Sequence, residues 1–388
     1  MVSVALRMKI QFILLLACCC QVLGQTASPQ PQWTVNLHHD QSFQNFERPG
    51  DSLWRRQQGV VFITPGQVAV YQVNERSSPT PLGLRDVNGG AGNFFLDLKI
   101  LDAHDGHAIK SMRFPTSGSF SHVIPGQAGN FVVRTGDILY LISPDSKVLA
   151  SKPLPLERVA PFESWQVDGS PSGAKIALIH QQIFIHAVVL ADGTVASPGK
   201  SKTEVEILDP ETLKVIKKFS VSNHLAHWSM GDSFLVGTHP TQPLHAEEFG
   251  ILDFEGRWKN LNAKFKSKEN CSPIMDALDH ELIAAYRCDG FVVLSESGDQ
   301  VFSAASRSKE QPVFVVSSGN YLAVEFASLP GPKDTKLQPL HIDLFDVKAG
   351  AGLISIPLEK TMVYCDVSRE GSAVVLEGTT LRMYALKK

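Results

Sequence analysis

The feature of this sequence that most constrains its fold is a loose repeat of short, β-rich segments. Apolar runs rich in β-branched residues alternate with turns of Gly, Asn, Asp and Pro along the chain. The inner runs centre near residues 132, 177, 235, 284, 323 and 375, so they lie 39 to 58 residues apart. No segment combines a sustained apolar period of 3.6 residues with capping signals, so we expect very little helix.

Two short phrases recur within this pattern. A small polar turn that leads into an apolar strand occurs at 170–178, 317–324 and 368–376. An apolar strand that ends in Asp, followed by a turn and an outgoing strand, occurs at 98–107, 205–216 and 342–350. Four strands per unit and about 40–50 residues per unit are typical of the blades of a β-propeller.

The blade count follows from these positions. Blades are predicted near 53–115, 121–155, 164–221, 226–263, 271–306, 312–358 and 362–387. The last stretch holds only three strands, whereas residues 33–37 form a strand with no neighbour in sequence. We therefore predict an all-β, seven-bladed β-propeller of four-stranded antiparallel blades, closed by the N-terminal strand pairing into the last blade. Such closure covers two exposed strand edges.

Part of this pattern resembles a known superfamily. The phrases SPSGAKIAL (170–178) and ILDPETLKVIKKFSV (207–221) resemble the WD40/YVTN-type β-propellers. With its N-terminal leader, the chain resembles secreted bacterial proteins of this kind, as found in Acidobacteria. The resemblance covers nearly all of the chain after the leader and implies the fold, but it implies little about function. No Trp-Asp dipeptide closes a blade and no Gly-His opens one, so the pattern departs from regulatory eukaryotic WD40 proteins.

The N-terminus reads as an export signal. In residues 1–24, Arg7 and Lys9 precede an apolar run at 10–20 that is too short to span a membrane, which is typical of a secretory signal peptide cleaved after Gly24. A second interpretation is a bacterial lipoprotein signal, because Leu15-Leu16-Ala17-Cys18 resembles a lipobox with Cys18 as the lipid anchor. Both predict a periplasmic or extracellular protein. Residues 25–32 are predicted to be a linker and 33–388 a single propeller domain, with no transmembrane span after cleavage.

The charge of the chain argues against a nucleic-acid partner. The formal net charge is −3, and loss of Arg7 and Lys9 with the leader changes it to −5. Nucleic-acid binding needs a dense positive surface. We therefore expect a protein or small-molecule partner and no nucleic acid.

Three of the six cysteines, Cys271, Cys288 and Cys365, lie beyond the leader. A hairpin centred on Asp279-His280 would pair residues whose numbers sum to 559, which places Cys271 directly opposite Cys288. In an oxidising compartment this pairing predicts a disulfide; the alternative is two unpaired, partly buried thiols. Cys365 lies in an apolar strand pattern and is predicted to be a buried free thiol.

Candidate binding residues come from the predicted starts of the innermost strands, where they border the central channel. These candidates are Arg55, Arg56, His122, Glu163, Trp165, His227, Trp228 and Tyr364. The two tryptophans would stack on a sugar or peptide, or else pack between blades. The two arginines would bind a carboxylate or phosphate.

The sequence contains none of the common catalytic signatures. It lacks a Gly-x-Ser-x-Gly elbow, a His-Glu-x-x-His motif and a phosphate-binding loop, and its histidines are scattered. We therefore predict an exported, non-catalytic binding scaffold with no catalytic residue, metal or cofactor. The alternative is a propeller-type enzyme, a metal-assisted lyase or lactone hydrolase, with His122, Glu163 and His227 contributing to a site in the channel.

Overall fold

The computed structural model describes residues 29–37, 58–75, 94–116, 121–154, 162–183, 188–189, 195–196, 201–221, 226–240, 247–261, 274–287, 290–328, 338–359 and 363–386. In this part of the chain nearly all regular structure is antiparallel sheet, and helix is limited to short 3-10 turns such as η3 (Gln127–Gly129) and η5 (Asp279–Glu281). No helix among the described residues is both long enough and apolar enough to cross a membrane.

The first three blades follow one another along the chain. Blade 1 contains β2 (Gln58–Thr64), β3 (Gln67–Glu75), β4 (Phe94–Asp102) and β5 (Ala108–Thr116). Blade 2 contains β6 (Ser121–Pro125), β7 (Phe131–Thr135), β8 (Ile138–Ile142) and β9 (Val148–Pro153). Blade 3 contains β10 (Phe162–Gly169), β11 (Ile176–Ile183), β14 (Ser201–Leu208) and β15 (Val215–Val221). Between β11 and β14, β12 (Val188–Val189) and β13 (Val195–Ala196) pair as a separate hairpin.

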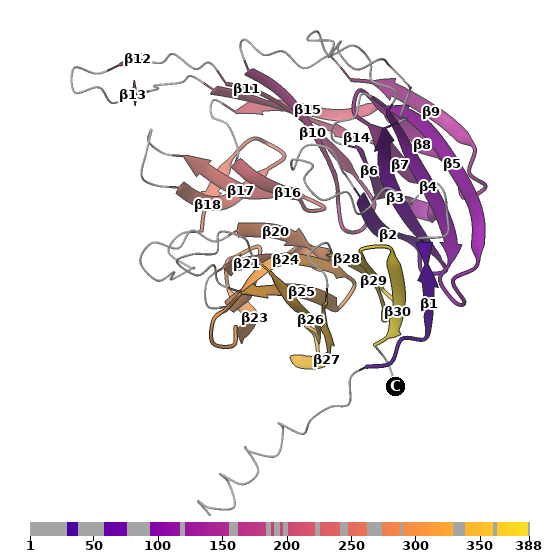
Figure 1. The fold of residues 1–388 in the computed structure, drawn as a ribbon. Coiled ribbons are helices and arrows are strands. Elements are labelled where there is room, and N and C mark those ends of the chain that lie inside the picture. The colour runs from indigo at the N-terminus through magenta and orange to yellow at the C-terminus, as the bar shows by residue number, and fades with distance from the viewer. Residues whose placement is uncertain are drawn as a thin grey trace, which may run out of the picture. The chain divides into compact units, whose positions relative to one another are not determined.

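Four more blades complete the ring (Figure 1). Blade 4 contains β16 (Ala226–Met230), β17 (Phe234–Pro240), β18 (Glu247–Asp253) and β19 (Trp258–Asn260). Blade 5 contains β20 (Ile274–Leu278), β21 (Leu282–Arg287), β22 (Gly290–Ser295) and β23 (Gln300–Ala305). Blade 6 contains β24 (Glu310–Ser318), β25 (Tyr321–Ser328), β26 (Pro339–Asp346) and β27 (Ala351–Pro357). Blade 7 contains β28 (Val363–Val367), β29 (Ser372–Glu377), β30 (Thr380–Ala385) and β1 (Trp33–Asn36). The predicted all-β, seven-bladed propeller is confirmed.

The ring is closed by the N-terminal strand, as predicted. β1 pairs antiparallel with β30, with Trp33 opposite Met383 and Asn36 opposite Thr380. The Trp33 indole Nε1 also donates a 2.9 Å hydrogen bond to the carbonyl oxygen of Ala103, which belongs to the β4–β5 turn of blade 1. The closing strand therefore contacts both the last and the first blade.

The hydrophobic core is divided among the seven seams between neighbouring blades. Each of the seven buried clusters combines side chains from two adjacent blades. Side chains alternate between the two faces of a strand. Along β11, Ile176 and Leu178 accordingly face blade 2, whereas Ala177 and Ile179 face blade 4. Second strands such as β25 are buried on both faces and are mostly apolar, whereas outer strands such as β9 and β23 are largely exposed.

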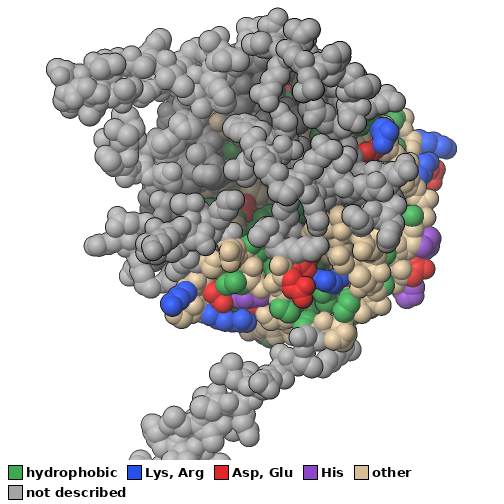
Figure 2. Space-filling model, in the orientation of Figure 1, with side chains coloured by type: hydrophobic (Ala, Val, Ile, Leu, Met, Phe, Trp, Pro, Cys, Tyr) green, Lys and Arg blue, Asp and Glu red, His purple; other side chains and the backbone are tan. Residues whose placement is uncertain are grey.

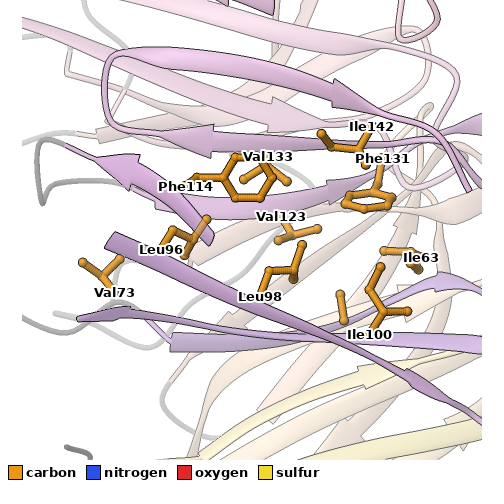
Figure 3. Packing of buried hydrophobic residues seen from close by; sticks show 11 residues of the cluster. Ile63, Val73, Leu96, Leu98, Ile100, Phe114, Val123, Phe131, Val133 and Ile142 are labelled. Atoms are coloured by element: carbon orange, nitrogen blue, oxygen red, sulfur yellow. The ribbon is translucent and has the colours of Figure 1, made fainter. Parts of the chain in front are cut away.

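The seam between blades 1 and 2 illustrates this packing (Figure 3). Leu98 and Ile100 of β4 meet Phe131 of β7, and each of these side chains is at most 1% exposed. Burying a side chain of this size contributes about 1.5–3 kcal/mol. The same cluster includes Ile63 of β2 and Val123 of β6, the inner strands that carry residues of the candidate site.

The predicted strand register of the hairpin that was to bring Cys271 opposite Cys288 is wrong by one residue. The β20–β21 hairpin pairs Ile274 with Tyr286, so partner numbers sum to 560 rather than 559, because η5 places three residues in the turn. Cys271 and Cys288 themselves lie outside the described residues. Cys365 is a buried free thiol, and burial raises its pKa, which disfavours the nucleophilic thiolate.

Candidate functional site

A cavity of about 580 Å³ lies among the inner strands that surround the axis of the ring. We call it the channel cavity. Ten of its lining residues belong to the inner strands of six blades: Gln58, Ser121, His122, Gln166, Val167, Asp168, Trp228, Ser229, Asp276 and Tyr364. Tyr71 and Arg134 reach it from the second strands of blades 1 and 2. The volume is in the range of ligand-binding pockets.

The structure brings three of the sequence-predicted candidates into this cavity. His122, Trp228 and Tyr364 all line it. Trp165 is instead only 9% exposed and stacks on His180, with 4.1 Å between ring centroids and 4° between ring planes. It packs between blades 2 and 3, which was the second of its two predicted roles.

The remaining candidates cannot be placed at the level of side chains. Glu163 belongs to β10 and His227 to β16, but their side chains lie outside the described part of the structure. Arg55 and Arg56 lie wholly outside it. Of the three residues proposed for an enzymatic site, His122 is the one whose side chain the structure describes, and it lines the channel cavity.

Tyr71 reaches the cavity because a glycine faces it. Tyr71 on β3 pairs with Gly59 on β2, and a Cβ atom at residue 59 would overlap the tyrosine ring. Because residue 59 has no side chain, the Tyr71 phenol can lie across β2 and reach the cavity. Burial raises the pKa of Tyr71, so the hydroxyl stays protonated.

The carboxylates of the cavity are held by protein donors. Asp168 accepts 2.9 Å hydrogen bonds from the backbone N–H groups of Gly169 and Met230. Burial nevertheless raises the pKa of Asp168 to about 6, outweighing these donors. Asp276 accepts a 2.6 Å hydrogen bond from the Tyr286 hydroxyl. Each carboxylate therefore has a structural role in its own blade or in the next one.

The basic side chains of the cavity are held in the same way. Arg134 is 2% exposed, and its Nη2 donates a 2.7 Å hydrogen bond to the Trp165 carbonyl oxygen. His122 Nε2 lies 3.0 Å from the Val167 carbonyl oxygen. Because a carbonyl oxygen only accepts, this nitrogen carries the proton. Both side chains of blade 2 thus bond the backbone of blade 3.

Two glutamines behave differently. Gln58 is 4% exposed, and neither its amide nitrogen nor its amide oxygen has a hydrogen-bond partner in the described structure. Gln72, directly opposite on β3, is 1% exposed and its amide oxygen also has no partner there. Buried polar groups are nearly always hydrogen-bonded, so these amides need an explanation.

A second cavity, of about 730 Å³, lies where the inner strands end. The recurring polar turns of blades 3, 6 and 7 line it, at 169–173, 316–318 and 366–369. Two of their serines, Ser170 and Ser368, bond within their own turns, whereas Ser317 accepts a hydrogen bond from the Asp279 N–H of the neighbouring blade. Ser170 Oγ accepts from the Ala174 N–H at 3.1 Å, and Ser368 Oγ accepts from the Ser372 N–H at 3.0 Å. The repeated phrase therefore stabilises a turn.

Among the described residues, the group whose ligand atoms could together hold a metal ion is Asp102, Asp105 and His107, with these atoms within 4.8 Å of one another. It lies on the β4–β5 turn, away from the channel cavity. Asp105 Oδ1 accepts from the His107 backbone N–H at 3.0 Å and lies 2.6 Å from His107 Nδ1. These contacts are those of an exposed polar turn.

The described surface is mixed in charge. On the face shown in Figure 2, Lys and Arg side chains lie near Asp and Glu. Opposite charges also meet in exposed ion pairs such as Lys217–Glu255 and Arg257–Asp253, in which the nitrogen and oxygen atoms are 2.6 Å apart. Such pairs contribute little to stability.

Sequence reasoning missed most of the polar residues of the channel cavity. Asp168 had a usable signal, because Asp168-Gly169-Ser170 and Asp366-Val367-Ser368 repeat an Asp-x-Ser phrase at the ends of two inner strands. Tyr71 and Arg134 lie on second strands, whereas the sequence-predicted candidates all came from the predicted starts of the innermost strands. Only the partner glycine at residue 59 hinted at an inward-reaching side chain.

Comparison with known proteins supports the fold. No protein family model matches the chain, and a search of curated proteins gives no match either. An acylaminoacyl peptidase in complex with a chloromethyl ketone shares a TM-score of 0.51 at 10% identity, over 86% of this chain and 52% of that chain. The acylaminoacyl peptidase of Pyrococcus horikoshii gives 0.50 at 12% identity, also over 86% and 52%. An uncharacterized protein from Listeria monocytogenes gives 0.47 at 10% identity, over 86% and 95%.

This chain thus spans about half the length of the peptidases that it resembles. At such low identity the likeness concerns the fold alone. The fold and the cavity define a seven-bladed β-propeller with a polar channel cavity.

Proposed function

We propose that this protein is an exported, non-catalytic β-propeller that binds a ligand or a partner segment in the channel cavity. The observation that carries the proposal is that the acidic and basic side chains described in the cavity already have protein partners. Asp168 is held by backbone N–H groups, Asp276 by the Tyr286 hydroxyl and Arg134 by a backbone carbonyl oxygen. A general acid or base must instead be able to reach the substrate.

One observation favours the enzymatic alternative. Asp276 is close enough to Asp168 to help raise its pKa, after the larger effect of burial, and that pKa is about 6. A carboxyl group with such a pKa in a cavity is a candidate acid or base. A metal-assisted lyase or lactone hydrolase would in addition lose activity and stability with a chelator.

The proposal is tested by ligand screening with a variant that fills the cavity. Gln166 lines the cavity and is exposed, so Gln166→Trp should fill the space without disturbing the core. Gln300→Trp, on the exposed outer strand β23, is the matched control. Thermal-shift screening of neutral sugars, capped peptides and small carboxylates should give a stabilising ligand whose effect is lost in Gln166→Trp alone.

Two results would count against the proposal. A ligand that stabilises Gln166→Trp as strongly as the wild type would place binding outside the channel cavity. Destabilisation by a chelator, reversed by one divalent metal and accompanied by turnover of a lactone or other substrate, would favour the enzymatic alternative.

Export is a separate part of the proposal and rests on the predicted leader. Expression of the full chain in a bacterial host, followed by intact mass measurement, distinguishes the two leader types. Cleavage after Gly24 gives an unmodified mature chain, whereas the lipoprotein alternative gives a chain that starts at a lipid-modified Cys18. Retention of the uncleaved leader in the cytoplasm would contradict both.

A further inference from the structure

Gln58 is the most unusual residue of the channel cavity, because it is a buried carboxamide whose nitrogen and oxygen both lack a hydrogen-bond partner among the described residues. We propose that the channel cavity binds a neutral sugar and that the Gln58 carboxamide contacts its hydroxyl groups. This inference rests on the proposed function and names the ligand class of the same site.

Leaving a buried amide unpaired costs free energy. A buried polar group without a partner is destabilising, and replacement by an apolar group of similar size removes that penalty. Gln58 nevertheless lines a cavity, and its amide nitrogen and oxygen are both buried and unpaired in the described structure, so the side chain has to turn toward the cavity before a ligand can contact the amide. A ligand that offers one acceptor and one donor side by side would satisfy it. Neighbouring hydroxyls on a sugar ring offer both.

The charged side chains of the cavity favour an uncharged ligand. The basic and acidic side chains that line the cavity bond to protein groups, Arg134 to the Trp165 carbonyl oxygen and Asp168 to two backbone N–H groups. A charged ligand would have to compete with these bonds for its counter-charge. An uncharged ligand need not do so.

The aromatic residues that line the cavity also suit a sugar. The Trp228 indole donates its N–H to the Gln166 side-chain oxygen, which fixes the ring and leaves its polar atom occupied. What Trp228 offers a ligand is an apolar ring surface, suited to the C–H face of a sugar. Tyr71 and Tyr364 add hydroxyl groups that stay protonated because burial raises both pKa values.

The test is Gln58→Leu, which keeps the bulk of the side chain and removes its donor and acceptor. Binding is measured by calorimetry and thermal shift with glucose, galactose, mannose, N-acetylglucosamine and their disaccharides as probes. We expect at least one sugar to bind the wild type and Gln58→Leu to weaken it about tenfold or more. The same variant should raise the Tm of the free protein, because it removes an unpaired buried amide. Gln300→Leu, an exposed control, should change neither quantity.

Other outcomes separate this inference from the proposed function. If no sugar binds but a capped tri-alanine peptide or a small carboxylate does, with loss in Gln166→Trp, the sugar is overturned and the binding function stands. If none of the probes binds, both are overturned. Sugar binding that is unchanged in Gln58→Leu would overturn the contact assigned to Gln58.

Discussion

The Asp366 carboxylate of blade 7 accepts a 2.7 Å hydrogen bond from the backbone N–H of Phe62 in blade 1, a residue 304 positions earlier in the chain. It also accepts from the N–H of the next residue, Val367, at 2.9 Å. Asp168 repeats this arrangement between blades 3 and 4, where it bonds Gly169 and Met230. A carboxylate at the end of an inner strand therefore links neighbouring blades at two places in the ring.

The first prediction is that these carboxyl groups stabilise the ring. At pH 5, Asp366→Ala should lower the free energy of unfolding by about 1–3 kcal/mol, because the buried N–H of Phe62 loses its acceptor. Asp168→Ala should have a similar effect, and Asp145→Ala, at an exposed position, almost none. Urea unfolding followed by fluorescence measures all three. Equal effects at Asp366 and Asp145 would show that the link is not stabilising.

The second prediction concerns pH. Burial raises the pKa of Asp366 to about 7, outweighing the N–H donors of Phe62 and Val367. An unfolded Asp has a pKa of about 3.9, so folding favours the protonated form. The associated stability is complete below about pH 4 and is lost as pH rises through about 7.

Asp366→Asn cannot titrate at this position. Relative to the wild type, its free energy of unfolding should therefore rise between pH 5 and pH 8, by an amount on the order of 2 kcal/mol. Unfolding in urea at the two pH values gives this difference, with Asp145→Asn as the exposed control. A difference that does not change with pH would contradict the raised pKa.

The third prediction concerns the contact between the closing strand and blade 1. Gly106, in the β4–β5 turn, has φ of +77°, and a Cβ there would lie 2.8 Å from Val35 Cγ2 and 2.9 Å from Trp33 Cε3. Gly350, in the corresponding turn of blade 6, has φ of +64° but no atom within 4 Å of such a Cβ. Both alanine variants share the backbone strain, so Gly106→Ala should cost about 1–3 kcal/mol more than Gly350→Ala. Similar Tm values for the two variants would mean that β1 can shift away from the added methyl group without a loss of stability.

The fourth prediction concerns Trp165 and Trp228, for which the sequence analysis gave the same two alternative roles. Trp165→Ala should destabilise the protein by about 3–5 kcal/mol, because this side chain is 9% exposed and stacked on His180. Trp228→Ala should cost less, because Trp228 is only partly buried and lines the channel cavity. Urea unfolding ranks the two costs, and ligand titration should show the greater loss of affinity for Trp228→Ala. The reverse ranking would contradict the roles assigned here.

Much of the fold could be predicted because it depends on local, periodic signals. Turn residues and apolar runs predicted each blade, and the shortage of strands after residue 362 predicted that residues 33–37 complete blade 7. The structure confirms both. One local detail failed, because η5 adds a residue to the β20–β21 turn and shifts the hairpin register by one. The length of such a turn cannot be predicted from the sequence to within one residue, yet a difference of one residue changes which side chains lie opposite each other.

By itself, the sequence determined the all-β architecture, the number of blades and the strand that closes the ring, because strand period and turn chemistry are encoded in neighbouring residues. Only the tertiary structure decided the candidate site. Gln58, Asp168 and Trp228 meet in one cavity although they belong to three different blades. It also separated Trp228 in the cavity from Trp165 in the core. The direction of an inner-strand side chain depends on the packing of adjacent blades, which no local pattern in the chain specifies.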